Sequence, residues 1–473
     1  MPSLNISFDS LPSSIRRPGK YFEFNTKLAV RTLASNLQRV LIVGQRIAAG
    51  SVPALTIKDV FSDAEAANYF GAGSIAHLMV RAAITANPYI ALQVIAMDDA
   101  GAGVVATGTH TTTGTATGSG VSTVNVGDMQ VAVAVATGDT PTVQAAALKA
   151  QFDKQTDLPV TATVAAGVLT VTAKNKGTLG NGIKISATNT APGSTVAVVA
   201  MASGASDPTI ATALATVLAG GHNIIISAWN DSTNLTALRT HLDFVSGPRE
   251  KRRAIAAYGH VGTLSQATTL AGTINSGRMT CGNLPGAYEN VFELAASYGA
   301  VIASEEDPAR PLNTLPLTGI SAPPLANRLS GTEIENALAN GVTPLTVGSG
   351  DKVQIERAVS TYTVDANGTP DISLLDLTTI RSMDYGAKAY ETRIALRFPR
   401  EKKTKRNKAR VLEELLDVSY KLEELEIIEN VAANAPGHLV EDDLQDPSRL
   451  DCKVPFDVVN GMHVVAGRLD LYL

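Results

Sequence analysis

Apolar runs of strand length alternate with helix-length segments along much of the chain, and this alternation limits the fold more than any other feature. The runs are short, rich in branched apolar residues and bounded by turn residues, which is typical of strands buried on both faces. They are RVLIVG (39–44), YIALQVIAM (89–97), HNIIISAW (222–229), RRAIAAYG (252–259) and RMTCG (278–282). Strands that alternate with helices in this way predict a mostly parallel sheet covered on both faces. We therefore predict an α/β domain built from residues 26–97 and 207–307.

The composition changes between these two segments, over residues 98–206. No arginine occurs between Arg81 and Arg239, and no Asp, Glu, Lys or Arg lies between Asp99 and Asp128. Short β-type runs with turn residues between them fill the rest: MQVAVAVAT (129–137), GVLTVTAK (167–174), GIKISATN (182–189) and STVAVVAM (194–201). They predict a mostly β domain inserted into the α/β domain. The low complexity of residues 100–123 is also typical of a disordered loop.

The last third of the chain begins with a linker, residues 308–330, in which prolines 308, 311, 316, 323 and 324 prevent regular structure. Residues 331–459 then carry strand-like runs and two helical segments, 373–399 and 407–434, which predicts an α+β C-terminal domain. The chain closes with FDVVNGMHVVAGRLDLYL. Here Asn460–Gly461 lies between two apolar runs, and because both residues tolerate positive φ, the pair predicts a β-hairpin.

The bulk composition excludes several classes of protein. A formal net charge of −5 does not match the basic surface of a nucleic-acid-binding protein. Two cysteines are too few for a disulfide framework and indicate a reducing compartment. No run of about 18 apolar residues occurs, so we expect no insertion into a membrane. Asp9 and Pro12 interrupt the apolar stretch that a signal peptide needs, so we expect folding inside the cell.

Motifs for catalysis or cofactor binding do not stand in the context that their chemistry needs. GAGSIA (71–76) follows a helical segment, and GAGVVA (101–106) leads into Thr/Gly-rich sequence, whereas a dinucleotide site needs a strand before and a helix after. Neither a phosphate-binding P-loop nor a G-x-S-x-G elbow occurs. A triad from remote positions stays open, with His260 at a strand end as its candidate histidine. We predict no catalytic, cofactor or metal site.

Both ends of the chain alternate apolar and polar residues, which is the period of a strand with one buried face. Near the N-terminus the alternating residues are Tyr21, Phe22, Glu23 and Phe24, and at the C-terminus Leu469, Asp470, Leu471, Tyr472 and Leu473. One interpretation makes them outer strands of the chain's own sheet. The other makes them arms, each of which adds a strand to a sheet in a different subunit.

A basic segment, residues 400–410 (REKKTKRNKAR), precedes an acidic amphipathic helix. Such a pair is commonly a solvated loop and a core helix, but opposite patches can also fix the register of neighbouring subunits. We expect a tube or neighbour contact here, made by Lys402, Lys403, Lys405, Arg406 and Lys408. Nucleic acid is the less favoured partner, because no aromatic residues are interleaved and the whole chain is acidic.

Four stretches in order resemble one family. These stretches are RRPGKYFEFN (16–25), the DAEAANYFGAGSIAHLM helix from residue 63, the RAVSTYTVDANGTPDISLLDL region from residue 357, and the closing NGMHVVAGRLDLYL. They are similar to segments of the tail sheath proteins of contractile-tailed bacteriophages, particularly the Mu-like branch. The likeness runs through nearly the whole chain and is weakest in residues 98–206, where sheath proteins vary most.

This resemblance implies a fold and a role. The α/β domain is expected to be subtilisin-like without a catalytic site, the inserted domain to lie outside, and residues 331–459 to face the tail tube. Subunits are expected to form hexameric rings stacked helically around that tube, with baseplate and tail terminator proteins at the ends. Residues 1–25 and 460–473 become linking arms that add strands to neighbouring subunits.

The expected function is therefore a structural subunit of the virion tail, made and assembled in the host cytoplasm, that contracts to drive the tube through the host envelope. No nucleotide or cofactor is needed, because new contacts between subunit bodies supply the work. Two alternatives stay open: an α/β hydrolase-like enzyme with a β accessory domain, and a surface adhesin suggested by the Thr/Gly-rich insertion.

Overall fold

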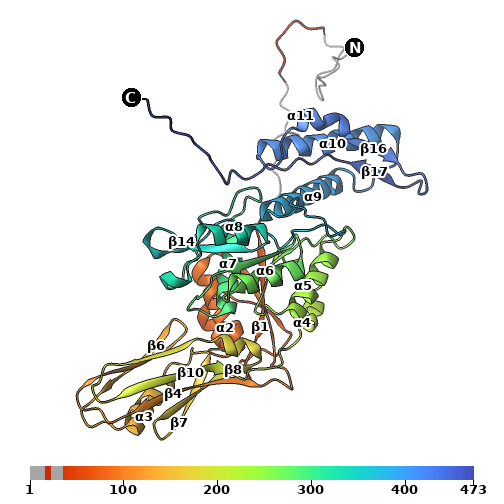
Figure 1. Cartoon of the computed structure of the whole chain (residues 1–473). Helices are drawn as coiled ribbons and strands as arrows, with labels where there is room; N and C mark the ends of the chain where they lie inside the picture. The colour runs from red at the N-terminus through yellow and green to blue at the C-terminus, as the bar shows by residue number, and fades with distance from the viewer. Residues whose placement is uncertain (1–15, 23–35, 473) are drawn as a thin grey trace.

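The computed structural model of the chain describes residues 16–22 and 36–472. Figure 1 shows an elongated molecule in three parts: a β-rich unit at one end, an α/β unit in the middle, and a helical unit at the other end. Each part has a hydrophobic core of its own, so the three parts are separately packed units.

The middle unit is built on an eight-stranded sheet with the order β15-β14-β13-β12-β11-β1-β3-β2. The six inner strands are parallel, and the edge strands β2 and β15 run antiparallel to their neighbours. The strands are β1 (Arg39–Gln45), β2 (Ile57–Asp59), β3 (Ala91–Met97), β11 (Ile224–Ser227), β12 (Ile255–His260), β13 (Met279–Asn283), β14 (Thr343–Val347) and β15 (Val353–Ile355). The mostly parallel sheet predicted from the apolar runs is confirmed, and it is formed from both sides of the insertion.

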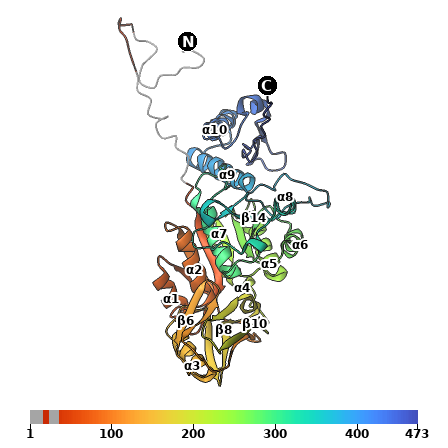
Figure 2. The same ribbon diagram turned by 60° about the vertical axis from the view of Figure 1, so that its left-hand side comes forward.

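Helices cover both faces of this sheet (Figure 2). On one face lie α1 (Asp63–Phe70), α2 (Ile75–Ala86) and α7 (Val291–Ser304). On the other lie α4 (Ala211–Thr216), α5 (Ser232–Val245) and α6 (Leu264–Ile274), with α8 (Gly331–Ala339) beside α6. Helix α7 is buried over nearly its whole length, because it packs between the sheet and α2. A Cβ at Gly299 would lie 2.6 Å from the Ile226 side chain, so a glycine is needed for this close approach.

The inserted unit consists of two antiparallel sheets, ordered β10-β4-β8-β7 and β6-β5-β9, with α3 packed against strands of both. Its elements are β4 (Val105–Thr113), β5 (Gly120–Val126), β6 (Met129–Val135), α3 (Pro141–Phe152), β7 (Val160–Ala165), β8 (Val168–Lys176), the 3₁₀ turn η2 (Thr178–Gly182), β9 (Ile185–Asn189) and β10 (Thr195–Ala202). The low-complexity stretch 100–123 contains strand β4 and the start of β5, so the disordered alternative for it is wrong.

The C-terminal unit is mainly helical. It contains α9 (Leu377–Arg397), α10 (Lys405–Glu424), α11 (Val431–Asn434) and a β ribbon of the antiparallel strands β16 (Leu439–Asp442) and β17 (Leu450–Lys453). The remaining 3₁₀ turns are η3 (Leu325–Asn327), η4 (Ser349–Asp351) and η5 (Ala435–Gly437).

Three details of the predicted C-terminal third differ from the structure. The segment 331–355 was grouped with the C-terminal domain, but β14 pairs with β13, so the α/β sheet continues through it. The predicted helix 407–434 breaks after Glu424, where Glu426 and Asn430 adopt positive φ. The hairpin predicted at Asn460–Gly461 is absent from the described residues 456–472, because the first run pairs through Val458 with Ile428 instead.

Candidate functional site

The C-terminal end of the chain is fastened to the body at one histidine. His463 Nε2 lies 2.8 Å from an Asp376 carboxylate oxygen, and its Nδ1 lies 2.9 Å from the Asn313 side-chain amide. Asp376 also receives a 2.9 Å hydrogen bond from Arg357 and is the N-cap residue of α9. The residue that fixes the end of the chain therefore sits where the body meets the C-terminal unit.

Beyond this anchor, residues 464–472 form what we call the C-terminal tail, which contains neither helix nor strand. Figure 1 shows it ending away from the rest of the molecule. Leu469 is 101% exposed and Tyr472 is 90% exposed, and Leu471 is similarly open. Arg468 and Asp470 pair with each other at 2.7 Å. The tail thus presents alternating apolar side chains to solvent; Leu473 lies outside the described residues.

The N-terminal candidate residues are described only in part. Residues 16–22 contain no helix or strand, and Phe22 is 88% exposed. The Tyr21 hydroxyl donates to the Arg17 carbonyl at 2.9 Å. Glu23 and Phe24 lie outside the described residues. Within the described residues, neither 16–22 nor 464–472 pairs with a strand of the same chain.

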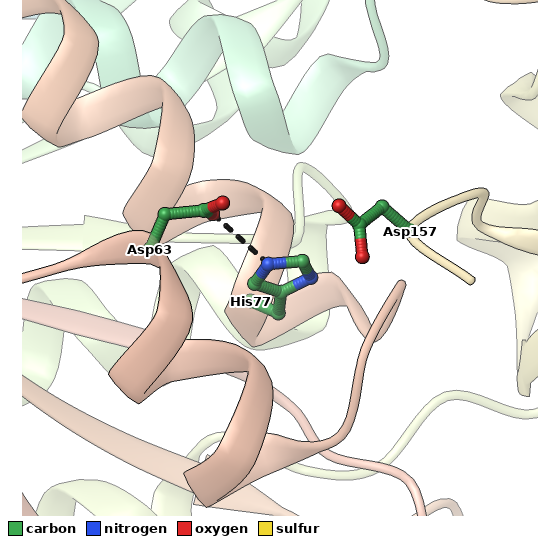
Figure 3. A group of neighbouring side chains, drawn as sticks. All are labelled: Asp63, His77 and Asp157. Atoms are coloured by element: carbon green, nitrogen blue, oxygen red, sulfur yellow. Dashed lines mark ion pairs between the residues drawn. The ribbon is translucent and has the colours of Figure 1, made fainter. Parts of the chain in front are cut away.

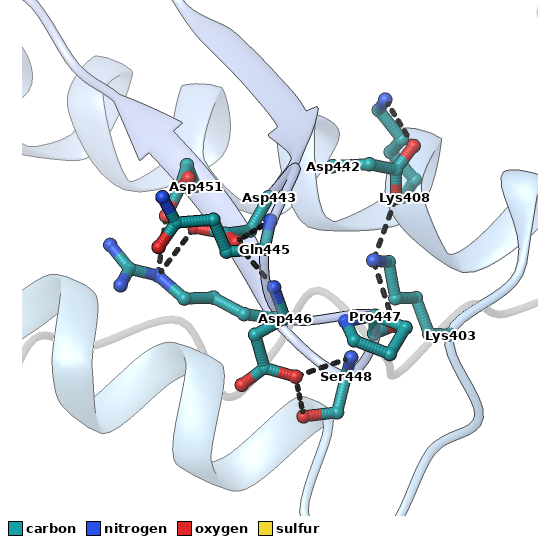
Figure 4. A network of polar contacts seen from close by, with 10 residues as sticks. Lys403, Lys408, Asp442, Asp443, Gln445, Asp446, Pro447, Ser448 and Asp451 are labelled. Atoms are coloured by element: carbon teal, nitrogen blue, oxygen red, sulfur yellow. Dashed lines mark hydrogen bonds and ion pairs between the residues drawn. The ribbon is translucent and has the colours of Figure 1, made fainter.

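Some basic side chains of residues 400–410 form ion pairs within the chain, and others form none in the described residues. Lys403 and Lys408 each pair with Asp442 on β16 at 3.1 Å, and Lys403 also donates to the Pro447 carbonyl (Figure 4). These hydrogen bonds from the two ammonium groups lower the pKa of the Asp442 carboxyl. Arg449, next to β17, pairs with Asp451 of that strand at 2.7 Å and with Asp443, next to β16, at 3.6 Å. The two lysines therefore hold the β ribbon against the start of α10.

The other three candidates, Lys402, Lys405 and Arg406, are exposed and form no ion pair within the described part of the chain. Lys405 and Arg406 open helix α10, whose first turn contains no acidic residue. Cations at a helix N-terminus oppose the macrodipole, at a cost of about 0.3–1 kcal/mol each. This placement disfavours the helix locally and leaves positive charge free for a partner.

A hydrolase site does not form around His260. Its Nδ1 lies 3.3 Å from the Asn283 amide oxygen, and burial lowers its pKa. Among the described residues no carboxylate pairs with it, so the orienting acid of a catalytic triad is missing.

One group that sequence reasoning missed has metal-ligand chemistry: Asp63 on α1, His77 on α2 and Asp157 in the inserted unit, with ligand atoms within 4.8 Å of one another (Figure 3). The Gly73 backbone N–H donates to His77 Nδ1, so the neutral imidazole carries its proton on Nε2, 2.9 Å from Asp63. Both ring nitrogens are thus engaged. Since Lys174 of the inserted unit also donates to the Ala72 carbonyl of the body at 2.9 Å, we interpret the group as a polar joint between the two units.

No helix in the described residues has both the length and the apolar character required to cross a bilayer. Within the described residues, the surface features that stand out are the exposed apolar side chains of the tail and the unpaired cations Lys402, Lys405 and Arg406.

Comparison with known families agrees with this description. Residues 177–361 match the model of the phage tail sheath protein central domain, and residues 369–471 match that of the phage tail sheath C-terminal domain. The chain belongs to the phage tail sheath proteins, which are structural components of contractile phage tails and not enzymes. The gap between the two matched regions falls after β15, in agreement with the place of β14 and β15 in the α/β sheet.

One curated relative supports the family by sequence, and solved structures can be compared by fold. The chain is 30% identical over 406 residues to the Mu-like prophage FluMu tail sheath protein of Haemophilus influenzae, across 84% of this chain and 83% of that protein. A chain in the cryo-EM structure of the anti-feeding prophage baseplate has the same fold, with a TM-score of 0.50 at 11% identity over 97% of this chain and 100% of that chain. The sheath tail protein of Desulfitobacterium hafniense aligns with a TM-score of 0.49 at 14% identity, over 90% and 94%.

Proposed function

We propose that this protein polymerises around an inner tail tube and contracts to drive the tube through the host envelope, with neighbouring subunits linked by β-strand addition. Its partners are other copies of itself in helically stacked hexameric rings, the tail tube protein, and the baseplate and tail terminator proteins. It is made and assembled in the host cytoplasm and ends up in the virion tail. The inserted unit faces outward, and the C-terminal unit faces the tube.

The exposed C-terminal tail is the observation that carries this proposal. Leu469 and Leu471 point apolar side chains into solvent on alternate positions, and the tail's backbone groups have no ladder partner among the described residues. Pairing with a sheet would contribute roughly 0.5–1.5 kcal/mol for each backbone hydrogen bond. Burying each leucine would contribute about 1.5–3 kcal/mol more. A segment of this kind is stabilised only when another molecule supplies the sheet.

The β ribbon is the acceptor that we propose for an incoming tail. It has only two strands within the described residues, and a two-stranded ribbon is marginally stable alone. Its outer edges leave backbone donors and acceptors available for another strand. The ribbon lies in the same C-terminal unit as the root of the tail, so one copy can donate a strand and accept another.

The contact with the tube or a neighbour is proposed for the basic segment, Lys402, Lys403, Lys405, Arg406 and Lys408. Since Lys403 and Lys408 already pair with Asp442, most of the available charge comes from Lys402, Lys405 and Arg406. Such charges steer and orient a partner more than they add affinity.

The test replaces the apolar face of the tail while keeping its length. In the double variant Leu469→Asp with Leu471→Asp, we expect a folded protein that no longer forms tubes in negative-stain electron microscopy. Asp470→Asn is the matched control from the opposite face and should still assemble. Deletion of residues 467–473 should likewise leave a folded, dispersed chain. Normal tubes from the double variant, or unfolding of the truncated chain in circular dichroism, would contradict strand addition.

A further inference from the structure

A cavity of about 320 Å³ lies between the α/β body and helix α9. Its body wall includes Arg39 at the start of β1, with Lys251 and Arg253 ahead of β12, and its other wall includes Arg381 and Lys388 of α9. Five cationic side chains therefore surround one small volume. Like charges held together in this way need anionic partners.

The two carboxylates in the lining do not meet that need. The Asp384 oxygens lie 2.7 and 2.9 Å from the two terminal nitrogens of Arg278. The Glu391 oxygens lie 2.8 and 3.1 Å from those of Arg253. Both are bidentate pairs that use every carboxylate oxygen. Neither acid forms an ion pair with Arg381, Lys251 or Lys388, although the charge of Lys251 helps to lower the pKa of Glu391.

Arg381 is a buried cation with one unused donor, although the carboxylates of Glu305 and Asp307 partly compensate its charge. The residue is only 6% exposed, and its Nη1 has no hydrogen-bond partner, while Nη2 donates to the Glu305 backbone carbonyl. Burial lowers its pKa to about 10. A buried guanidinium with an unused donor is costly unless an acceptor is supplied from elsewhere.

The two lysines at the mouth of the cavity also lack an ion-pair partner within the described residues. Lys251 and Lys388 are exposed, and neither forms an ion pair in the described part of the chain. Lys251 adopts positive φ (58°), a backbone conformation that is unfavourable for a residue other than glycine. The loop therefore keeps an ammonium group on the cavity wall despite a local penalty.

We propose that this cavity binds an oxyanion, a phosphate or a carboxylate, between Arg381 Nη1 and the ammonium groups of Lys251 and Lys388. Guanidinium and ammonium groups are the donors that recognise such oxygens. Because Lys251 belongs to the body and the other two belong to α9, the bound group links the C-terminal unit to the body. The ligand is either a free ion or an acidic side chain of a second copy.

The first experiment measures thermal unfolding of the dispersed full-length chain in sodium phosphate against sodium chloride at equal ionic strength. We expect phosphate to raise the Tm saturably by a few °C, as binding to the folded state alone requires. The double variant Lys251→Gln with Lys388→Gln should lose this response. The matched control, Lys58→Gln with Lys352→Gln, removes two exposed lysines elsewhere and should keep it. Equal phosphate responses from all three proteins would overturn the site.

The second experiment identifies the source of the oxyanion by lysine acetylation and mass spectrometry on assembled tubes. Protection of Lys251 and Lys388 without added phosphate identifies a carboxylate of a neighbouring copy, and protection only after phosphate is added identifies a free ion. Full reactivity of both lysines under both conditions would overturn the proposal. The thermal measurement does not require tubes, so failure of the proposed polymer function would not be mistaken for failure of this site.

Discussion

Glu293 shows how much one residue depends on its surroundings. It lies in the first turn of α7, 5% exposed, where its carboxylate accepts from the Asn290 backbone N–H at 3.1 Å and caps the helix. Arg81 approaches at 3.5 Å. Burial, together with the charge of Asp128, nevertheless raises its pKa to about 7. The residues that cap the helix are neighbours in the sequence, whereas the shift of the pKa arises from burial and from groups on distant segments.

This shift predicts a pH dependence of stability with a definite sign. Between about pH 4.5 and 7 the folded Glu293 carboxyl holds a proton that the unfolded chain releases, so stability falls as pH rises through this window. The loss is complete above pH 7 and amounts to roughly 3 kcal/mol. Glu293→Gln keeps the cap but cannot ionise. Urea unfolding should show that the free energy of unfolding of the variant rises relative to that of the wild type between pH 5 and pH 8. A difference between the two free energies that does not change with pH would refute the assignment.

At the scale of elements, the sequence predicted those whose signal is local and missed those set by distant contacts. The buried runs that became β1, β3, β11 and β12 were found because their apolar character is continuous. The Asn460–Gly461 hairpin failed because Val459 N–H donates to the Ile427 carbonyl, so the first run pairs with another segment. The alternation of the tail is visible in the sequence, and its pairing with another copy stays a prediction. The His463 anchor and the lysines held by Asp442 depend on side chains far apart in sequence.

The link between the basic segment and the β ribbon gives a prediction for these elements. Asp442→Ala removes the acceptor of both Lys403 and Lys408, so β16 and β17 should exchange their amide hydrogens faster. The Tm should stay unchanged, because the pair is exposed and screened by solvent. Glu413→Gln, an exposed acid on α10 without an ion pair among the described residues, is the control and should not alter exchange. Unchanged exchange in Asp442→Ala would show that the ribbon is held by other contacts.

At the scale of the whole molecule, polar groups join the inserted unit to the body. Asn175 on β8 is 5% exposed, accepts from the Ile75 N–H at 3.1 Å and donates to the Arg46 carbonyl at 2.9 Å. Asp99 also receives a hydrogen bond from Asn175 at 2.9 Å. The insertion could be predicted from composition, but its attachment could not, because nothing local marks Asn175 as different from the other polar residues of its strand.

Asn175→Ala should therefore weaken the connection between the two units. The change leaves the Ile75 N–H at the start of α2 without its acceptor, which costs about 1–3 kcal/mol in a buried position. Urea unfolding followed by tryptophan fluorescence, which reports the buried Trp229 of the body, should show this loss. Asn125→Ala, an amide on β5 bonded to Ser186 at 3.3 Å, should cost much less. Equal losses for the two variants would contradict a special role for Asn175.

The position of His463 has a mechanical consequence. Its bond to Asp376 attaches the tail at the N-cap of α9, on the line where body and C-terminal unit meet. If copies are tethered as proposed, tension along the tether falls on the base of α9, next to the body, instead of the inserted unit.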